Sequence, residues 1–160
     1  MKKFIPVAVP NLSGNEKKYV NDCIDTTWIS SNGEYIKKFE KAFAEYEGSK
    51  HALSCCNGTV ALHLPLLGLG LKEGDEIIIP SLTYIATANA VRYCGATPVL
   101  ADSLADTWNI DPSDIERKIT YKTKGIIPVH LYGNPCDMAA IKKIADKYNL
   151  MVCIMGHAGD

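Results

Sequence analysis

The sequence has 160 residues, of which 47% are hydrophobic and 22% are charged, a composition typical of a globular protein. Lys and Arg number 17 and Asp and Glu 18, so the formal net charge is -1. This balance argues against binding to nucleic acid or to an anionic membrane. The longest apolar run, residues 60–71, is too short to span a bilayer. We expect a cytoplasmic protein.

The cysteines lack the paired spacing of a zinc site. Most of them lie in apolar segments, so we interpret them as buried, reduced thiols and expect no disulfide framework. They are Cys23, Cys55, Cys56, Cys94, Cys136 and Cys153. A metal site assembled from His130, Cys136, Asp137 and His157 would have no recognised ligand spacing, so no metal is expected.

The first part of the chain is predicted to be helical. One helix is expected over residues 15–25. A second is expected over residues 34–46, because apolar side chains recur every three or four positions from Ile36 to Tyr46. We treat residues 1–50 as an amino-terminal helical segment.

From His51 onward, short β-type runs alternate with helical stretches. The strands are expected at 51–55, 76–79, 97–101, 125–129 and 150–154, and the helices at 58–69, 85–94, 112–119 and 137–148. This alternation predicts an α/β fold with three layers (α/β/α), in which helices cover both faces of a mostly parallel sheet. Pro65 is expected to interrupt the helix that contains it.

Ligands of open α/β sheets bind beyond the carboxyl ends of the strands, so the residues after each strand are the candidates. Gly58 and Thr59 open a helix whose first N–H groups lack partners, which suits a phosphate. The same residues also fit a plain helix start with Asn57 as N-cap. Tyr84 could stack on a flat ligand ring or pack over the sheet. His130 is interpreted as a structural hydrogen-bonding residue.

Six segments recur in the order of a known family. They are Thr27-Trp28-Ile29-Ser30-Ser31, 57–64, 74–84, 95–99, 107–112 and 129–133. With the flanking residues from Pro10 to about Val152, they resemble the DegT-type nucleotide-sugar aminotransferases, which are fold-type I enzymes dependent on pyridoxal 5′-phosphate (PLP). They are most similar to members that aminate GDP-linked 4-keto-6-deoxy sugars. The resemblance implies that residues 51–160 are the first part of the PLP-binding large domain of an aspartate-aminotransferase-like enzyme.

The resemblance also implies roles for the residues that follow the strands. Gly58 and Thr59 would bind the PLP phosphate through their N–H groups, with the Thr59 hydroxyl as a further donor. Tyr84 would lie against the pyridine ring. Both roles concern binding of the cofactor, and none of the three residues would be catalytic.

Trp28, Ser30 and Ser31 lie in a segment that approaches the sugar-nucleotide site in relatives. The reaction implied is transfer of an amino group from glutamate to the 4-keto carbon of a nucleotide-linked sugar. Relatives build their active sites across a homodimer interface, so a homodimer is expected.

The chain departs from the family at its last predicted strand. In relatives an Asp after this strand keeps the pyridine nitrogen protonated. Here Met155 stands in its place, and Asp160 comes five positions late. Lys142, Lys143 and Lys147 have the spacing of a solvated helix face, and the Schiff-base lysine of the family belongs to a later segment.

We therefore expect the 160-residue chain to be the amino-terminal part of such an enzyme, shortened by truncation or a frameshift. It would have no catalytic residue and would be inactive alone. Two alternatives remain open. One is a PLP-dependent sugar 3-dehydratase of the same family, and the other is a non-catalytic remnant that binds phosphate or PLP weakly.

Overall fold

The structure, a computed structural model, describes residues 4–6 and 9–156. The chain forms two compact units, one up to Cys55 and one from Cys56 onward. The first holds helices α1 (Glu16–Asp25) and α2 (Glu34–Tyr46). Helix α2 has the bounds predicted from the sequence, and α1 starts one residue late because Asn15 is its N-cap. None of the described residues of this unit is buried, so it has no core of its own.

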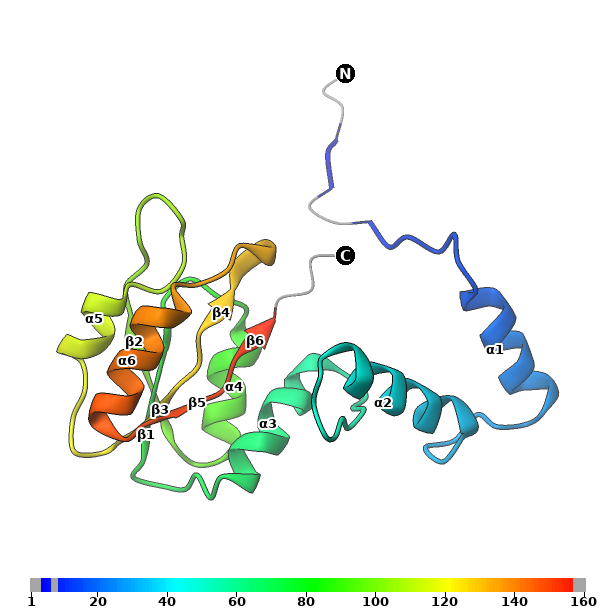
Figure 1. Ribbon diagram of the computed structural model, residues 1–160, viewed down its shortest axis with the longest axis horizontal. Helices are drawn as coiled ribbons and strands as arrows, with labels where there is room; N and C mark the ends of the chain where they lie inside the picture. Colours follow the sequence, from blue (N-terminus) through cyan, green and yellow to red (C-terminus); the bar gives the residue numbers. More distant parts are fainter. Residues whose placement is uncertain (1–3, 7–8, 157–160) are drawn as a thin grey trace. The chain divides into compact units, whose positions relative to one another are not determined.

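The second unit alternates helices and strands (Figure 1). In chain order they are α3 (Gly58–Gly68), β1 (Glu76–Pro80), α4 (Ile85–Tyr93), β2 (Thr97–Ala101), α5 (Pro112–Arg117), β3 (Thr123–Ile126), β4 (Val129–His130), the 3-10 turn η1 (Leu131–Gly133), α6 (Met138–Tyr148), β5 (Met151–Val152) and β6 (Met155–Gly156). This order confirms the predicted alternation.

Four strands form one parallel sheet in the order β2-β1-β3-β5, and β4 and β6 form a separate parallel pair. The predicted strand at 125–129 is divided into β3 and β4 at Pro128, which has no N–H for a ladder bond. Gly125 lets β5 approach closely, since a Cβ there would lie 2.9 Å from the carbonyl oxygen of Met151. Parallel pairing puts the carboxyl ends of the strands at one edge.

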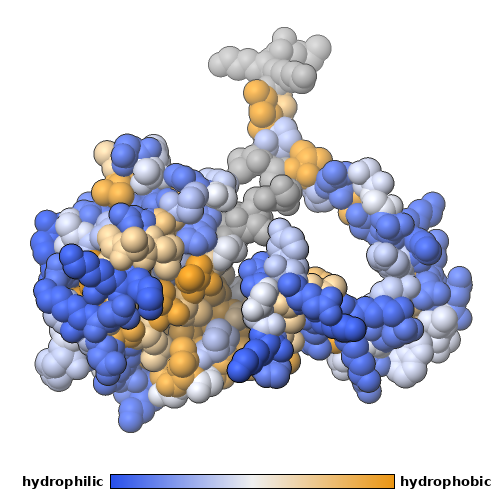
Figure 2. All heavy atoms as spheres, in the orientation of Figure 1, coloured by the Kyte–Doolittle hydropathy of each residue, from blue (hydrophilic) through white to orange (hydrophobic). Residues whose placement is uncertain are grey.

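Each face of the sheet is covered by a pair of helices. Ile77 and Ile79 of β1 pack into one core cluster with α3 and α4, and Ile78 packs into the other with α5 and α6. All three isoleucines are fully buried. This alternation confirms the three-layer α/β/α architecture. Figure 2 shows hydrophobic surface gathered on this unit, whereas α1 and α2 are mostly hydrophilic.

The predicted strand at residues 51–55 is wrong. The segment has no strand hydrogen bonds, and Ser54 donates both its backbone N–H and its hydroxyl to Glu40 Oε1, each at 2.9 Å. The same two bonds lower the pKa of Glu40. A strand forms only beside a partner, and no described strand pairs with this segment.

The expected interruption of α3 at Pro65 is also wrong. The helix continues from Gly58 to Gly68 with Pro65 inside it. Because proline has no N–H, it cannot donate a hydrogen bond to the carbonyl group of Ala61. Leu62 and Leu66, on either side of Pro65, are buried in the core and hold the helix in place.

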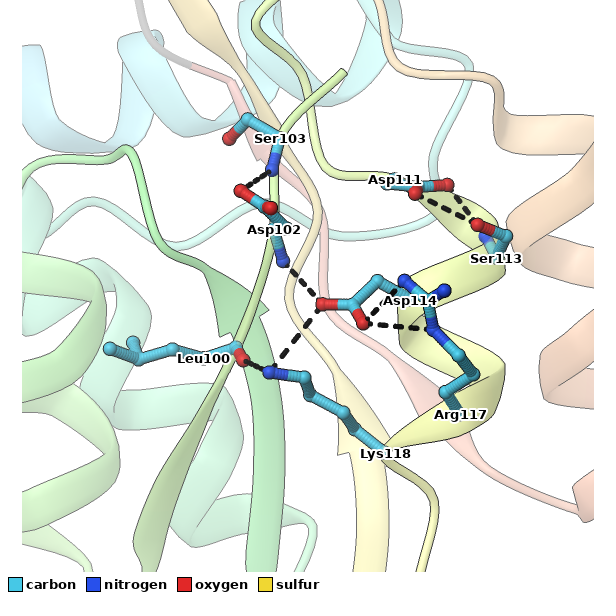
Figure 3. A network of polar contacts seen from close by, with 8 residues as sticks. All are labelled: Leu100, Asp102, Ser103, Asp111, Ser113, Asp114, Arg117 and Lys118. Carbon is cyan, nitrogen blue, oxygen red and sulfur yellow. Dashed lines mark hydrogen bonds and ion pairs between the residues drawn. The ribbon is translucent and has the colours of Figure 1, made fainter. Parts of the chain in front are cut away.

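A polar network fixes the loop that follows β2 (Figure 3). The buried carboxylate of Asp114 in α5 accepts a hydrogen bond of 2.6 Å from the N–H of Asp102. It also accepts from Arg117 at 2.9 Å and lies 3.5 Å from Lys118 Nζ. The Asp102 N–H is the main cause that lowers the pKa of Asp114, and the two cations add to it. The network anchors the start of residues 102–111, which lead to the candidate site.

Candidate functional site

The amino terminus of α3 is an open anion-binding position. Asn57 caps the helix by accepting a hydrogen bond of 3.0 Å from the N–H of Val60. Among the described residues, none accepts from the N–H groups of Gly58 and Thr59. A Cβ at Gly58 would have no described atom within 4 Å, so this first position of the helix is uncrowded. Unpaired N–H groups at the positive end of an 11-residue helix suit a phosphate.

Tyr84 directly precedes α4, four residues after the end of β1. Tyr84 has an extended backbone conformation at the end of the loop between β1 and α4, and its side chain is 65% exposed. The hydroxyl groups of Thr83 and Thr87 hydrogen bond at 3.0 Å across the first turn of α4. The exposure of the ring is compatible with stacking on a flat ligand, which stays a prediction for this position.

A pocket of about 420 Å³ lies beside Tyr84. Its walls come from the segments after β1, after β2 and after β4, so it sits at the edge where the strands end. The lining residues are Leu82, Thr83, Tyr84, Thr107, Trp108, Leu131 and Tyr132. Sequence analysis singled out only Tyr84 among them. The rule that ligands bind after strand ends could have added Trp108 and Tyr132, but only the fold brings the three segments together.

Trp28, Ser30 and Ser31 lie between α1 and α2 in the first unit. Trp28 and Ser30 line a hollow of about 380 Å³, and Ser31 does not. In the same hollow, the hydroxyl of Tyr35 donates a hydrogen bond of 2.9 Å to Asp22, which raises the pKa of Tyr35 to about 12. The structure thus brings two of the three predicted substrate residues together.

Met155, at the place of the Asp found in relatives, has a well-packed thioether side chain. Met155 pairs with Val129 in the β4–β6 ladder and packs against the core cluster of α3 and α4. Its sulfur accepts a hydrogen bond of 3.3 Å from the hydroxyl of Thr87. A thioether cannot hold a proton on a ring nitrogen. Asp160 and His157 lie outside the described residues.

The lysines of α6 have the contacts of a solvated helix face. Lys147 lies 2.6 Å from Glu116, and this bond raises the pKa of Lys147. Lys142 pairs with Asp146 at 3.5 Å. A nucleophilic lysine needs the opposite environment, one that lowers its pKa.

His130 is structural, as the sequence suggested. Its Nδ1 accepts a hydrogen bond of 3.1 Å from the N–H of Cys136, which closes the turn between β4 and α6. No group of His, Cys, Asp or Glu side chains within residues 4–6 and 9–156 could hold a metal ion.

All six cysteines are free thiols. Burial raises the pKa of Cys94, Cys136 and Cys153. Of the six cysteines, Cys136 is buried, Cys23, Cys55, Cys94 and Cys153 are partly buried, and Cys56 is exposed directly before Asn57. The prediction of buried thiols is therefore confirmed for Cys136 and wrong for Cys56. No helix in the part of the chain that the structure describes is long and apolar enough to cross a membrane.

The model of the DegT/DnrJ/EryC1/StrS aminotransferase family matches residues 10–154 of the chain. The chain belongs to this family. It is 59% identical over 150 residues to the GDP-perosamine synthase of Escherichia coli O157:H7, a match that covers 94% of this chain and 41% of the relative. The chain therefore spans about two fifths of the length of that relative.

Two solved aminotransferase structures are similar to this chain in fold. The aminotransferase from Psychrobacter cryohalolentis has a TM-score of 0.88 and 39% identity, over 98% of this chain and 40% of that one. NtdA from Bacillus subtilis, solved with bound cofactor PMP, has a TM-score of 0.81 and 36% identity, over 96% of this chain and 38% of that one. DegT-family aminotransferases depend on PLP.

The described residues fit PLP in part. The N–H groups of Gly58 and Thr59, which have no acceptor among the described residues, and the uncrowded position of Gly58 fit its phosphate. The exposed ring of Tyr84 fits a planar group. Met155 does not fit the pyridine nitrogen, because PLP chemistry needs an acid at that atom. The fit therefore extends to the phosphate and the ring face of the cofactor, and not to its pyridine nitrogen.

Proposed function

We propose that this chain supplies the amino-terminal, phosphate-binding part of a PLP-dependent aminotransferase that acts on a nucleotide-linked 4-keto-6-deoxy sugar. The open amino terminus of α3 carries this proposal, together with membership of the family. PLP supplies an electron sink when bound. Gly58 and Thr59 hold its phosphate through their backbone N–H groups, and Tyr84 lies against its ring. Residues 51–160 are the first part of the PLP-binding domain, preceded by the helical segment 1–50.

The proposed substrate follows from a relative whose name states a GDP-linked sugar, GDP-perosamine synthase. Trp28 and Ser30 line a hollow in the first unit, and we assign them, with Ser31, to substrate binding. Glutamate is the proposed amino donor, and a homodimer the proposed assembly. The free cysteines favour the reducing cytoplasm.

A second candidate function is a non-catalytic one, and Met155 favours it. A chain that anchors the phosphate but has a thioether at the place of the acid would bind PLP without using it. The two candidates share the same binding site and differ in turnover.

The binding site can be tested with Gly58→Asp. Asp in the first turn suits the helix dipole, so the fold should be kept, while its carboxylate repels a phosphate. We expect PLP affinity, measured by equilibrium dialysis, to fall about tenfold or more.

Ala139→Asp is the matched control, because Ala139 is exposed in the first turn of α6, so the same charge is added at another helix start. It should leave PLP affinity unchanged. Equal PLP binding by the parent chain and Gly58→Asp would refute the phosphate site.

A further inference from the structure

Two asparagines of the chain are followed by glycine, Asn32 and Asn57. In this dipeptide the side-chain amide of asparagine lies next to a backbone N–H that no Cβ shields, because glycine has no side chain. That backbone nitrogen can attack the amide carbon. The dipeptide is therefore a place where the chain can modify itself, and the two dipeptides have different surroundings in the fold.

Asn57 is restrained by the helix that it caps. Its Oδ1 accepts a hydrogen bond of 3.0 Å from the N–H of Val60, and its Nδ2 donates one of 3.4 Å to Cys56 Sγ. Its backbone is extended and leads directly into Gly58, the first residue of α3. A rotation that brings the Gly58 nitrogen toward the Asn57 amide carbon would have to break the cap and displace the first turn of α3.

Asn32 lies in the loop between α1 and α2 and has no such restraint. It is exposed, and no described residue forms a hydrogen bond with its side chain. No backbone N–H from Ser30 to Gly33 donates a hydrogen bond to a described residue. Gly33, and not Asn32, is the N-cap of α2. A rotation of the Asn32 backbone can therefore be taken up by the loop without breaking a cap bond.

We propose that Asn32 is a site of spontaneous deamidation. The backbone nitrogen of Gly33 attacks Cγ of Asn32, a C–N bond forms, and the Cγ–Nδ2 bond breaks. Nδ2 leaves as ammonia with the proton of the Gly33 N–H, and a cyclic imide remains. Water then opens the imide at one of its two carbonyl groups, which gives either an aspartate or an isoaspartate at this position. The net reaction converts an amide and water into a carboxylic acid and ammonia, so it needs no oxidant or reductant.

The modification places a carboxylate beside a hollow that is already acidic. Gly33 lines the hollow of the first unit together with Asp22 and Glu34, and none of its lining residues is Lys or Arg. The new carboxyl group is ionised at neutral pH and makes the net charge one unit more negative. It also stands before the first turn of α2, where the helix dipole favours a negative charge. The product should therefore accumulate as a folded, more acidic form of the chain, whether or not the proposed function holds.

Peptide mapping by mass spectrometry tests the proposal. The chain is incubated at neutral pH, either folded or unfolded in guanidinium chloride, and the amide that remains at each asparagine is followed with time. In the folded chain we expect Asn32 to react about tenfold faster than Asn57, because the cap of α3 must open before Asn57 can react. In the unfolded chain the two rates should become similar, because both asparagines are followed by glycine.

Gly33→Ala is the variant that blocks the reaction. Gly33 has φ -109°, and the nearest described atom to a Cβ there would be Trp28 Cβ at 3.7 Å, so alanine fits. Its methyl group shields the attacking nitrogen, and the rate at Asn32 should fall about tenfold or more.

Gly68→Ala is the matched control, because a Cβ there would have no described atom within 4 Å. It should leave the rate at Asn32 unchanged. Equal rates at Asn32 and Asn57 in the folded chain, or an unchanged rate in Gly33→Ala, would overturn the proposal. So would an intact Asn32 in the folded chain over a time in which the unfolded chain is converted.

Discussion

Asp114 shows how one buried carboxylate can determine the position of a loop. It accepts from the N–H of Asp102 at the end of β2 and from Arg117 in its own helix. Its side chain is 8% exposed, whereas those of its cationic partners reach solvent. Loss of the charge would leave the N–H of Asp102 with a weaker acceptor and the loop toward Trp108 less firmly held.

We expect Asp114→Asn to lower the free energy of unfolding at pH 7 by about 1.5–3 kcal/mol, the usual contribution of hydrogen bonds to a charged group. The pKa of Asp114 is lowered in the fold, so its contribution is present above the unfolded pKa of about 3.8 and is lost as pH falls through the folded value. Urea unfolding at pH 7 and in steps down to pH 2 should therefore show the difference from the parent shrinking with acid.

Asp146→Asn is the control for this series. Asp146 is exposed and pairs with Lys142 at 3.5 Å, a contact worth less than about 1 kcal/mol. A pH-independent difference between Asp114→Asn and the parent would count against the account of this network.

Local residue roles could be read from the sequence where neighbours along the chain decide them. Asn57 as N-cap and His130 as a structural residue are examples, since their partners lie three and six positions away. Buried Asn109, which joins the segment after β2 to the segment after β4 by hydrogen bonds, could not be found in this way. Its partners are 22 to 26 positions away, and only the fold brings them within hydrogen-bond distance.

At the scale of elements, helix α3 combines an open amino terminus with an internal proline. The two features are separable, because Gly58 begins the helix and Pro65 lies in its second half. Burial of Leu62 and Leu66 offsets the lost hydrogen bond at Pro65. The helix therefore forms although the proline inside it disfavours a helix at this position.

Pro65→Ala should raise the free energy of unfolding by about 1–3 kcal/mol, because alanine restores the N–H and has the best helix propensity. Thermal unfolding followed by circular dichroism measures this. Leu64→Ala, a change at an adjacent and 45% exposed position, should have no stabilising effect. An unchanged or lower midpoint for Pro65→Ala would mean that the proline ring contributes packing that outweighs the missing bond.

Most elements of the second unit could be predicted, because the periodicity of the hydrophobic residues and the positions of the turn residues indicate the same boundaries. Strand β2 has the predicted bounds, 97–101. The strand predicted at residues 51–55 is absent because strand formation depends on a pairing partner. A β-type run becomes a strand only when a neighbour completes its ladder, and the pattern of one segment does not show whether that neighbour exists.

At the scale of the whole molecule, binding and chemistry are separate requirements. In the proposed site, Gly58 and Thr59 anchor the phosphate and Tyr84 contacts the ring. They offer a thioether at Met155. The two described lysines with a shifted pKa, Lys38 and Lys147, both have it raised, the opposite of what a nucleophile needs. We therefore expect the chain to bind the cofactor without catalysing amino-group transfer.

Binding and turnover can be measured in the same experiment. The purified 160-residue chain is incubated with PLP, glutamate and a GDP-linked 4-keto-6-deoxyhexose, and both retained PLP and amino sugar are quantified by mass spectrometry. We predict that PLP is retained by the chain, that retention falls in Gly58→Asp, and that no amino sugar forms. Formation of the amino sugar by the purified chain would contradict the account.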